Sequence, residues 1–366
     1  MKVGILTFHR ALNYGAVLQA YALKTVIAEK GHNAEVVDYR NEVIESLYDY
    51  PGFFKHKGLK NKIKYLVYSR KERLQRARFE EFRKNYLGLV DSRIYTKDNI
   101  SEANKNYDTF LVGSDQVWNP DAHDFDDNFF LSFASEKRKR HSYAASFGVE
   151  SIDAKHFEKC KDLVSGFSVC SVRETQGIDV LNSLGKTEAR VDLDPSLLLD
   201  KTNWQRNLNL AEPKEKYVLL YSFALTNRQK DMLRYCYKMG YKVKMIGKTL
   251  KNPFDFPCEF VSAVSPVDFV QLFYGASFVV TNSFHGTAFA INFCKPLAVE
   301  LLPSGSKVNS RLVNILSLVS LDNRLLSDSI SCEQIYNNSI DWECVKSKLQ
   351  EMRASSIKYL EECLDD

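Results

Sequence analysis

The sequence lacks the marks of a disulfide-linked secreted domain and of a membrane-spanning protein. Its eight cysteines include no C-x-x-C pair, so the spacing indicates neither a disulfide framework nor a structural zinc site. No stretch approaches the roughly 18 apolar residues of a transmembrane helix. The apolar run in MKVGILTFHR is also shorter than that of a signal peptide. We therefore expect a cytoplasmic protein that needs no metal and no cofactor.

The chain also lacks a strong charge of either sign. Its formal net charge is +4 over 366 residues, which does not indicate a general nucleic-acid binder, and no zinc-finger spacing or aromatic–basic ribonucleoprotein motif is present. Hydrophobic residues make up 45% and charged residues 26%, as in ordinary globular enzymes. At about 150 residues per domain, this length predicts two domains.

One segment, residues 55–84, departs from this balance. It carries twelve Lys or Arg against three Glu, with aromatic and aliphatic residues between them. A solvated helical face explains this pattern. The alternative is a peripheral surface that faces anionic lipid or a lipid-linked substrate.

Strand-like runs alternate with helical patterns, which favours an α/β fold with mainly parallel sheets. In the first half we expect strands at 3–8, 34–37, 109–112, 142–146, 167–171 and 190–193, with a helix at 14–30. In the second half we expect strands at 217–221, 242–246, 259–261, 278–281 and 296–299. Two prolines and clustered charge at 194–216 place the boundary between a domain at 1–200 and one at 210–340. A final amphipathic helix, 341–364, is expected to pack back on the first domain.

Two candidate sites follow strands of the first domain, where open α/β sheets bind ligands. In FHRALNYGAVLQAYAL (8–23), His9, Asn13 and Tyr14 precede a helix. These residues are placed to bind a ligand. The alternative is that they form an ordinary loop between a strand and a helix. In DTFLVGSDQVWNP (108–120), Asp115 is either a helix cap or a base for a substrate hydroxyl. The remaining candidates there are residues suited to a polyhydroxylated acceptor: Gln116, Trp118 and Asn119.

Three further segments suit an anionic ligand. Arg173, in SVCSVRETQG, has the planar fork that binds carboxylate or phosphate, or forms a surface ion pair. In VVTNSFHGTA (279–288), Ser283 caps a predicted helix near Phe284, Gly286 keeps the first turn thin, and His285 stands at its positive end. In PSGSKVNSR (303–311), Lys307 and Arg311 flank a glycine–serine loop that is equally consistent with an anion site and with a plain loop.

Taken together, these motifs resemble the polysaccharide pyruvyl transferase family. The matching segments are TFHRALNYGAVLQAYAL, DTFLVGSDQVWN, SYAASFG, SVRE, DLDPSLLL, VVTNSFHGTAFAI and DNRLL. The resemblance implies two Rossmann-like domains around a cleft, as in glycosyltransferase-B enzymes. It also implies transfer of a pyruvyl group from phosphoenolpyruvate to a sugar or lipid-linked saccharide, as a cyclic ketal, in surface polysaccharide synthesis such as that of capsule or exopolysaccharide.

By the same resemblance, Arg173 binds phosphoenolpyruvate and His285 is the active-site histidine. Some members place an arginine two residues before this histidine, where this chain has Ser283. We expect Lys295, Lys307 or Arg311 to supply that charge. The chemistry needs cations for two anionic groups, an acid and a base, for which His285 and Asp115 are the candidates.

Two other functions fit the same sequence. A nucleotide-sugar glycosyltransferase of the same fold would hold a diphosphate at the helix start near residues 283–286. A non-catalytic saccharide-binding protein would keep the aromatic residues and tolerate loss of Arg173 and His285.

Overall fold

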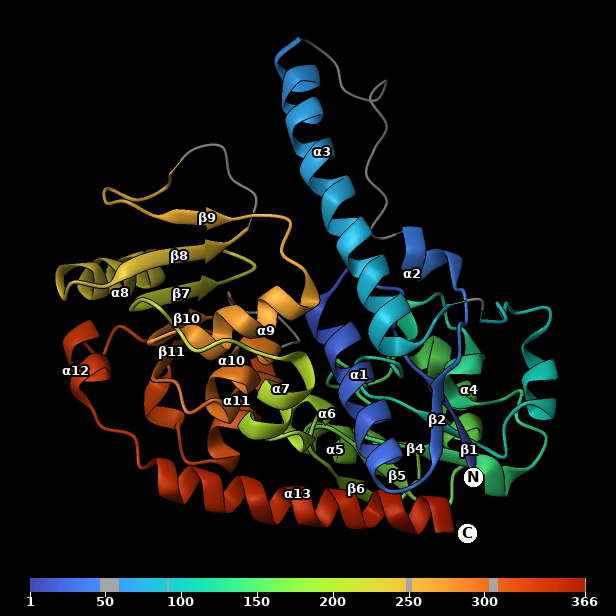
Figure 1. Cartoon of the computed structure of the whole chain (residues 1–366). Helices are drawn as coiled ribbons and strands as arrows, with labels where there is room; N and C mark the ends of the chain where they lie inside the picture. Colours follow the sequence, from blue (N-terminus) through green and yellow to red (C-terminus); the bar gives the residue numbers. More distant parts are fainter. Residues whose placement is uncertain (47–58, 91, 248–251, 303–308, 366) are drawn as a thin grey trace. The chain divides into compact units, whose positions relative to one another are not determined.

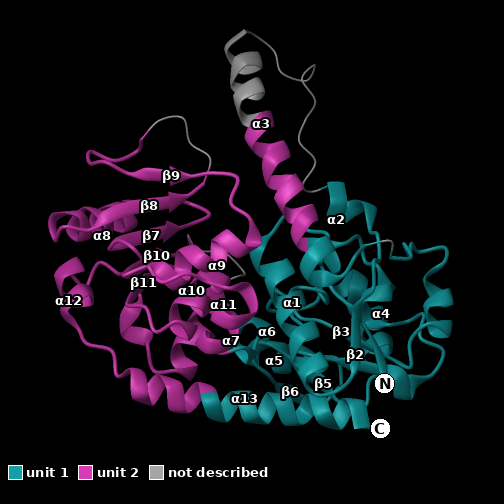
Figure 2. Cartoon of the chain, viewed as in Figure 1, with its two compact units in different colours: residues 1–49, 83–199, 350–366 teal, residues 50–82, 200–349 magenta. Residues whose placement is uncertain are grey.

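The computed structural model describes residues 1–46, 59–90, 92–247, 252–302 and 309–365, with the side chains of 59–68 left out. Within these ranges the chain forms two compact units (Figure 2). Unit 1 comprises residues 1–49, 83–199 and 350–366, and unit 2 comprises residues 50–82 and 200–349.

Unit 1 is built on parallel strands (Figure 1). Its sheet has the order β2-β1-β3-β4, and a two-stranded pair, β5-β6, is joined to it through isolated bridges at Ala145. The strands are β1 (Lys2–Leu6), β2 (Asn33–Val36), β3 (Thr109–Val112), β4 (Arg140–Ser142), β5 (Cys170–Val172) and β6 (Ala189–Val191). The helices are α1 (Tyr14–Glu29), α2 (Glu42–Ser46), α4 (Ala154–Val164), α5 (Thr175–Ser183) and α6 (Pro195–Leu198), and a π-helical turn covers Arg83–Leu87.

Unit 2 contains one five-stranded parallel sheet of order β11-β10-β7-β8-β9. The strands are β7 (Tyr217–Tyr221), β8 (Lys242–Ile246), β9 (Glu259–Val261), β10 (Phe278–Thr281) and β11 (Leu297–Val299). The helices are α3 (Leu59–Phe82), α7 (Lys201–Leu208), α8 (Asn227–Lys238), α9 (Pro266–Gly275), α10 (Phe284–Asn292), α11 (Asn309–Leu318) and α12 (Cys332–Asn337). The last helix, α13 (Trp342–Asp365), crosses the division between the units at residues 349 and 350.

The central strands of both sheets are covered on two faces, as is usual for parallel sheets. Every residue of β3 and β10 is buried, which explains their continuous apolar runs. In each sheet the strand order reverses at the first strand of the unit. As a result β1 lies between β2 and β3, and β7 lies between β8 and β10. This is the Rossmann-like arrangement, whose ligand site lies at the carboxyl ends of those two central strands. The predicted class, α/β with two Rossmann-like units, is confirmed.

Strand positions in unit 2 follow the sequence prediction closely, and β7, β8, β9 and β10 have the predicted bounds. In unit 1 the predicted strand at 142–146 is wrong in extent. The strand ends at Ser142, and Ala145 beyond it makes only isolated bridges to Asp115 and Val172. The strand predicted at 167–171 begins instead at Cys170.

Only part of the basic segment 55–84 lies within the described residues. Its Phe79 and Phe82 side chains are buried, so they do not form an apolar surface for lipid. Arg78 bonds to the carbonyl oxygen of Ala263 at 2.6 Å and pairs with Asp268 at 3.5 Å, both within unit 2. Among the described helices, none has the length and apolar character to cross a bilayer.

Candidate active site

In unit 1, the carboxyl ends of β1 and β3 are joined by buried hydrogen bonds. The hydroxyl of Thr7 donates to the carbonyl oxygen of Ser114 at 3.1 Å, and the side-chain amide of Gln19 donates to Thr7 Oγ1 at 2.7 Å. The backbone N–H of Ser114 in turn donates to Gln19 at 3.0 Å. A side chain at Gly113 would overlap the carbonyl oxygen of Tyr143, so this glycine permits a close backbone approach. The loops at this edge are therefore held rigidly.

His9 is fully buried beside this network, and its predicted role in binding an acceptor stays a prediction. The residue is 0% exposed. Its ring nitrogens contact the Thr7 carbonyl oxygen and Asp38 Oδ1, each at 3.1 Å. Burial lowers the pKa of His9, whereas the Asp38 hydrogen bond acts in the opposite direction. Burial would raise the pKa of Asp38, but the hydrogen bonds from His9 and Arg40 outweigh it and lower that pKa.

Trp118 is also a core residue, and its predicted role in acceptor binding stays a prediction. Its side chain is 0% exposed, it lies parallel to Phe130 at 5.6 Å between ring centroids, and its Nε1 donates to the Phe129 carbonyl oxygen at 3.1 Å. Both faces and the polar edge are used inside the protein. Gln116 and Asn119 are half-buried and joined by a 3.2 Å hydrogen bond.

Asn13 is the N-cap of α1, where its side-chain oxygen accepts from the N–H groups of Gly15 and Ala16. This contact explains an asparagine at a helix start without any ligand. Tyr14 is the first residue of α1 and is 6% exposed. The predicted acceptor role of both residues stays a prediction.

Arg173 follows β5 and lies among three carboxylates of unit 1. Its Nη1 bonds to Asp194 Oδ2 at 2.8 Å, while Asp115 and Glu174 lie at 3.6 and 3.7 Å. The guanidinium side chain is 1% exposed and Asp194 is 0% exposed. Burial opposes the charge, but the neighbouring carboxylates outweigh it and raise the pKa of Arg173. An anionic substrate that reached this cation would compete with the Asp194 carboxylate.

Asp115 is the least enclosed member of this cluster. It follows the carboxyl end of β3 with a φ of 73°, in the left-handed region that few non-glycine residues adopt. Its side chain is 13% exposed, and one carboxylate oxygen accepts from the N–H of Gln116 at 2.9 Å. The helix-cap interpretation does not apply, because no helix begins here.

In unit 2, the junction of β10 and α10 has the predicted form. Ser283 is the N-cap of α10, and its hydroxyl oxygen accepts from the N–H of Gly286 at 3.4 Å. His285 is the second residue of the helix, 9% exposed, with its ring edge-on to Phe284 at 5.2 Å between centroids. The imidazole thus lies at the positive end of a helix and at the carboxyl edge of the sheet.

Gly286 is required for a reason other than the one predicted. A side chain there would overlap Thr281 Oγ1, so the space is filled by a threonine hydroxyl of β10 rather than left for an anion. That hydroxyl donates to the Tyr221 carbonyl oxygen at 2.6 Å and accepts from the Ser283 N–H at 3.1 Å. The glycine lets α10 pack closely against its own strand.

Lys295 lies at the far end of α10 from His285, so the structure does not bring these two side chains together. Lys295 follows the end of α10, and the nine residues of this helix span about 13 Å. It also precedes β11, which runs parallel to β10, so it lies at the amino edge of the sheet. Burial, followed by the nearby charge of Lys201, lowers the pKa of Lys295 to about 8.

Arg311 remains a candidate, since it lies in the first turn of α11 and is 8% exposed. Asn309, at the start of the same helix, exchanges two 2.9 Å hydrogen bonds with the backbone of Leu302, which follows β11. This places the helix start at the carboxyl edge of the sheet. Lys307 lies outside the described residues.

The sequence analysis missed two carboxylates. Asp194 bonds to Arg173 and caps α6 through the N–H of Ser196 at 2.9 Å. Glu300 directly follows β11 and is 4% exposed. A signal for Glu300 was present, because an acidic residue immediately after a buried strand is unusual in a core position. Among the residues described, no group of three His, Cys, Asp or Glu side chains is placed to hold a metal ion.

The two Rossmann-like units and the polar carboxyl edges of their sheets define an α/β protein of the kind that binds ligands at strand ends. The family model described as polysaccharide pyruvyl transferase matches residues 13–299, and the chain belongs to this family. No curated protein matches the chain.

The solved structures that this chain is similar to are remote in sequence. UDP-GlcNAc 2-epimerase from Neisseria meningitidis, solved with UDP-GlcNAc, is 11% identical, with a TM-score of 0.48 over 100% of this chain and 99% of that one. The epimerase from Methanocaldococcus jannaschii, also 11% identical, has a TM-score of 0.47 over 100% and 99%. A heptosyltransferase from E. coli is 12% identical, with a TM-score of 0.34 over 96% and 99%.

Proposed function

We propose that this protein transfers the pyruvyl group of phosphoenolpyruvate to a free or lipid-linked saccharide, as a cyclic ketal, during synthesis of a surface polysaccharide. The family match over residues 13–299 carries this proposal, because its range includes Asp115, Arg173 and His285. The His285 position, in the first turn of α10 at a carboxyl sheet edge, suits chemistry beside an anion.

The reaction balances without a further reactant. A proton adds to C3 of phosphoenolpyruvate, which leaves a cationic C2 stabilised by its oxygen. One sugar hydroxyl forms a C–O bond to C2, the C–O bond to phosphate breaks, and a second hydroxyl closes the ketal. The two hydroxyl protons end on C3 and on the departing phosphate. The site must therefore provide one acid, one base and positive charge.

We assign the role of general acid to His285. An imidazole side chain can act as a general acid and as a general base, so it can give and regain a proton during turnover. The N-terminal amides of α10 and its dipole favour a negatively charged substrate beside the imidazole. In this proposal His285 protonates C3 or the departing phosphate.

For positive charge we assign Arg311, which lies at the carboxyl edge of unit 2. Arg173 is the family's assignment for the donor, and in this chain it is paired with Asp194 at 2.8 Å. Donor binding at Arg173 then requires exchange of that ion pair. Asp115 is assigned to the acceptor hydroxyl, because its carboxylate is partly exposed at the end of β3.

The direct test incubates the purified protein with phosphoenolpyruvate and a panel of free and lipid-linked galactosides. We expect phosphate release and a mass gain of one pyruvate ketal on an acceptor. Parallel reactions with UDP-sugars test glycosyl transfer. A folded sample that transfers sugar from UDP-sugars, and releases no phosphate from phosphoenolpyruvate with any acceptor, would contradict the proposal.

The acid role has its own test. His285→Ala should lower the rate by at least about 10²-fold, the low end for loss of an acid–base group. His32→Ala is the matched control, because His32 is half-buried in the turn after α1 in unit 1 and lies outside the proposed machinery. A near-normal rate for His285→Ala would remove His285 from the mechanism.

A further inference from the structure

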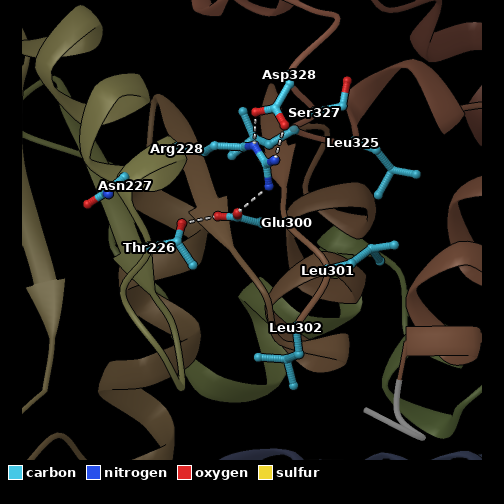
Figure 3. Close-up of a pocket in the computed structure, with 10 residues that line it drawn as sticks. Thr226, Asn227, Arg228, Glu300, Leu301, Leu302, Leu325, Ser327 and Asp328 are labelled. Atoms are coloured by element: carbon cyan, nitrogen blue, oxygen red, sulfur yellow. Dashed lines mark hydrogen bonds and ion pairs between the residues drawn. The ribbon is translucent and has the colours of Figure 1, made fainter. Parts of the chain in front are cut away.

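A pocket of about 770 Å³ opens at the carboxyl edge of the unit 2 sheet (Figure 3). Three segments line it: the start of α8 at 226–228, the residues after β11 at 300–302, and the segment 325–328. Its floor is fixed to the sheet, because the N–H of Glu300 donates to the Thr281 carbonyl oxygen at 3.0 Å and the N–H of Leu326 donates to that of Val299 at 2.7 Å. The pocket is therefore built on the same strands that position His285.

Glu300 is the central polar group of this pocket. It accepts a hydrogen bond from the Thr226 hydroxyl, and its other oxygen lies 3.4 Å from Arg228 Nη1. An ionised carboxylate accepts about four hydrogen bonds. The described residues provide two, so the carboxylate has capacity for two more donors from a ligand.

The charge of the pocket argues against an anionic ligand. Arg228 is already bound to Asp328 by two hydrogen bonds, at 2.8 and 2.6 Å. One cation thus faces two carboxylates, Glu300 and Asp328, and the lining has a net negative charge. This charge disfavours phosphoenolpyruvate or a diphosphate, whereas neutral hydroxyl groups can donate to Glu300.

The remaining lining selects among neutral ligands. Figure 3 shows Arg228 between Glu300 and Asp328, with the labelled leucines along another part of the pocket: Leu301, Leu302 and Leu325. No aromatic ring is among the described residues that line it, so a nucleobase has no stacking partner. A sugar ring combines hydroxyl donors with an apolar C–H face and matches both parts.

We propose that this pocket is a saccharide subsite, in which Glu300 accepts hydrogen bonds from two neighbouring hydroxyls of one sugar residue. The inference rests on the proposed function, to which it adds a subsite in unit 2 for one sugar residue of the acceptor. The apolar face of the ring packs on the leucines. The net negative charge of the pocket favours a neutral sugar over the anionic donor.

Binding is measured without turnover, so that its failure is distinct from failure of the proposed reaction. Saturation-transfer NMR on the full chain uses methyl glycosides of galactose, glucose, mannose and N-acetylglucosamine at millimolar concentration. We expect at least one glycoside to bind, and Glu300→Gln to weaken it by about 10-fold or more, since charged hydrogen bonds are lost. Glu259→Gln, an exposed carboxylate of β9 outside the pocket, is the matched control and should leave binding unchanged.

A second variant, Leu301→Trp, fills the pocket without altering its polar groups and should abolish glycoside binding. Circular dichroism and the melting temperature show whether each variant folds. The inference is overturned if no glycoside binds the wild-type chain, or if binding persists unchanged in both pocket variants. The inference is also overturned if UDP or phosphoenolpyruvate binds the wild-type chain and Leu301→Trp removes that binding while Glu300→Gln does not.

Discussion

Replacing Arg173 by methionine tests what the buried ion-pair cluster does for unit 1. The change removes the guanidinium that bonds to Asp194 at 2.8 Å and lies within 4 Å of Asp115 and Glu174. Breaking a buried ion pair by removing one partner costs about 3–5 kcal/mol, because the other charge is left uncompensated. Asp194 keeps the hydroxyl and N–H donors of Ser196, so we expect the lower end, about 3 kcal/mol.

For a unit of this size, each kcal/mol moves the melting temperature by about 2–4 °C. Arg173→Met should therefore melt about 6–12 °C below the wild type by scanning calorimetry at pH 7. The control is Arg138→Met, which removes an equally short ion pair, 2.6 Å to Glu136, whose arginine side chain is 73% exposed. Exposed pairs contribute about 0–1 kcal/mol, so this variant should melt close to the wild type.

The two roles of Arg173 make different predictions in this experiment. If Arg173→Met melts within about 2 °C of the wild type and loses phosphoenolpyruvate binding, then the ion pair does not support the unit and our reasoning is refuted. If it melts at the lower temperature expected, loss of activity alone is no evidence for a contact between Arg173 and the donor.

Two further predictions concern unit 2. Because burial lowers the pKa of Lys295 from 10.5 to about 8, the unfolded chain binds one more proton than the folded chain between these values, and stability rises with pH across that window. Lys295→Met should raise the free energy of unfolding at pH 7 by about 1 kcal/mol, after allowance for the partial exposure of Lys295. In denaturant titrations this stabilisation should vanish near pH 10. A stabilisation that grows with pH would contradict the prediction. Gly286→Ala should destabilise by about 2 kcal/mol through overlap with Thr281 Oγ1, and Thr281→Ala in the same chain should restore part of the loss. Gly247→Ala, where the nearest atom is a methionine methyl at 3.5 Å, is the control and should be near neutral, and equal effects at both glycines would contradict the packing argument.

The sequence predicted the elements of unit 2 well, because buried parallel strands such as β7 and β10 read as continuous apolar runs between charged helices. The Ser283 cap and the position of His285 followed from local signals alone. The surroundings of the side chains, by contrast, could not be predicted from local sequence signals. Nothing near Trp118 in the sequence shows that Phe130 and Phe147 cover it, and nothing near Arg173 shows that Asp194 lies beside it. These partners come from other segments, so only the fold brings them together.

The same limit applies to the surroundings of Lys295 and Gly286. Lys295 lies ten residues from His285 in sequence, but a helix carries the chain back across the sheet between them. Gly286 was predicted to keep the first turn of the helix thin for an anion, whereas Thr281 of the preceding strand lies where its side chain would be. Glu300 was overlooked because its significance depends on Thr226 and Arg228, more than seventy residues earlier.

The division of the chain between the units also governs the order in which the protein can fold during synthesis. Unit 1 needs residues 350–366, where Tyr359 donates to the Ser142 carbonyl oxygen at 3.1 Å and Arg353 to that of Leu197 at 2.6 Å. Unit 2 is contributed by the stretches 50–82 and 200–349. The ribosome therefore delivers the last segment of unit 1 only after all of unit 2. A chain truncated near residue 345 would therefore lack the part of α13 that belongs to unit 1, although most of unit 1 is synthesised first.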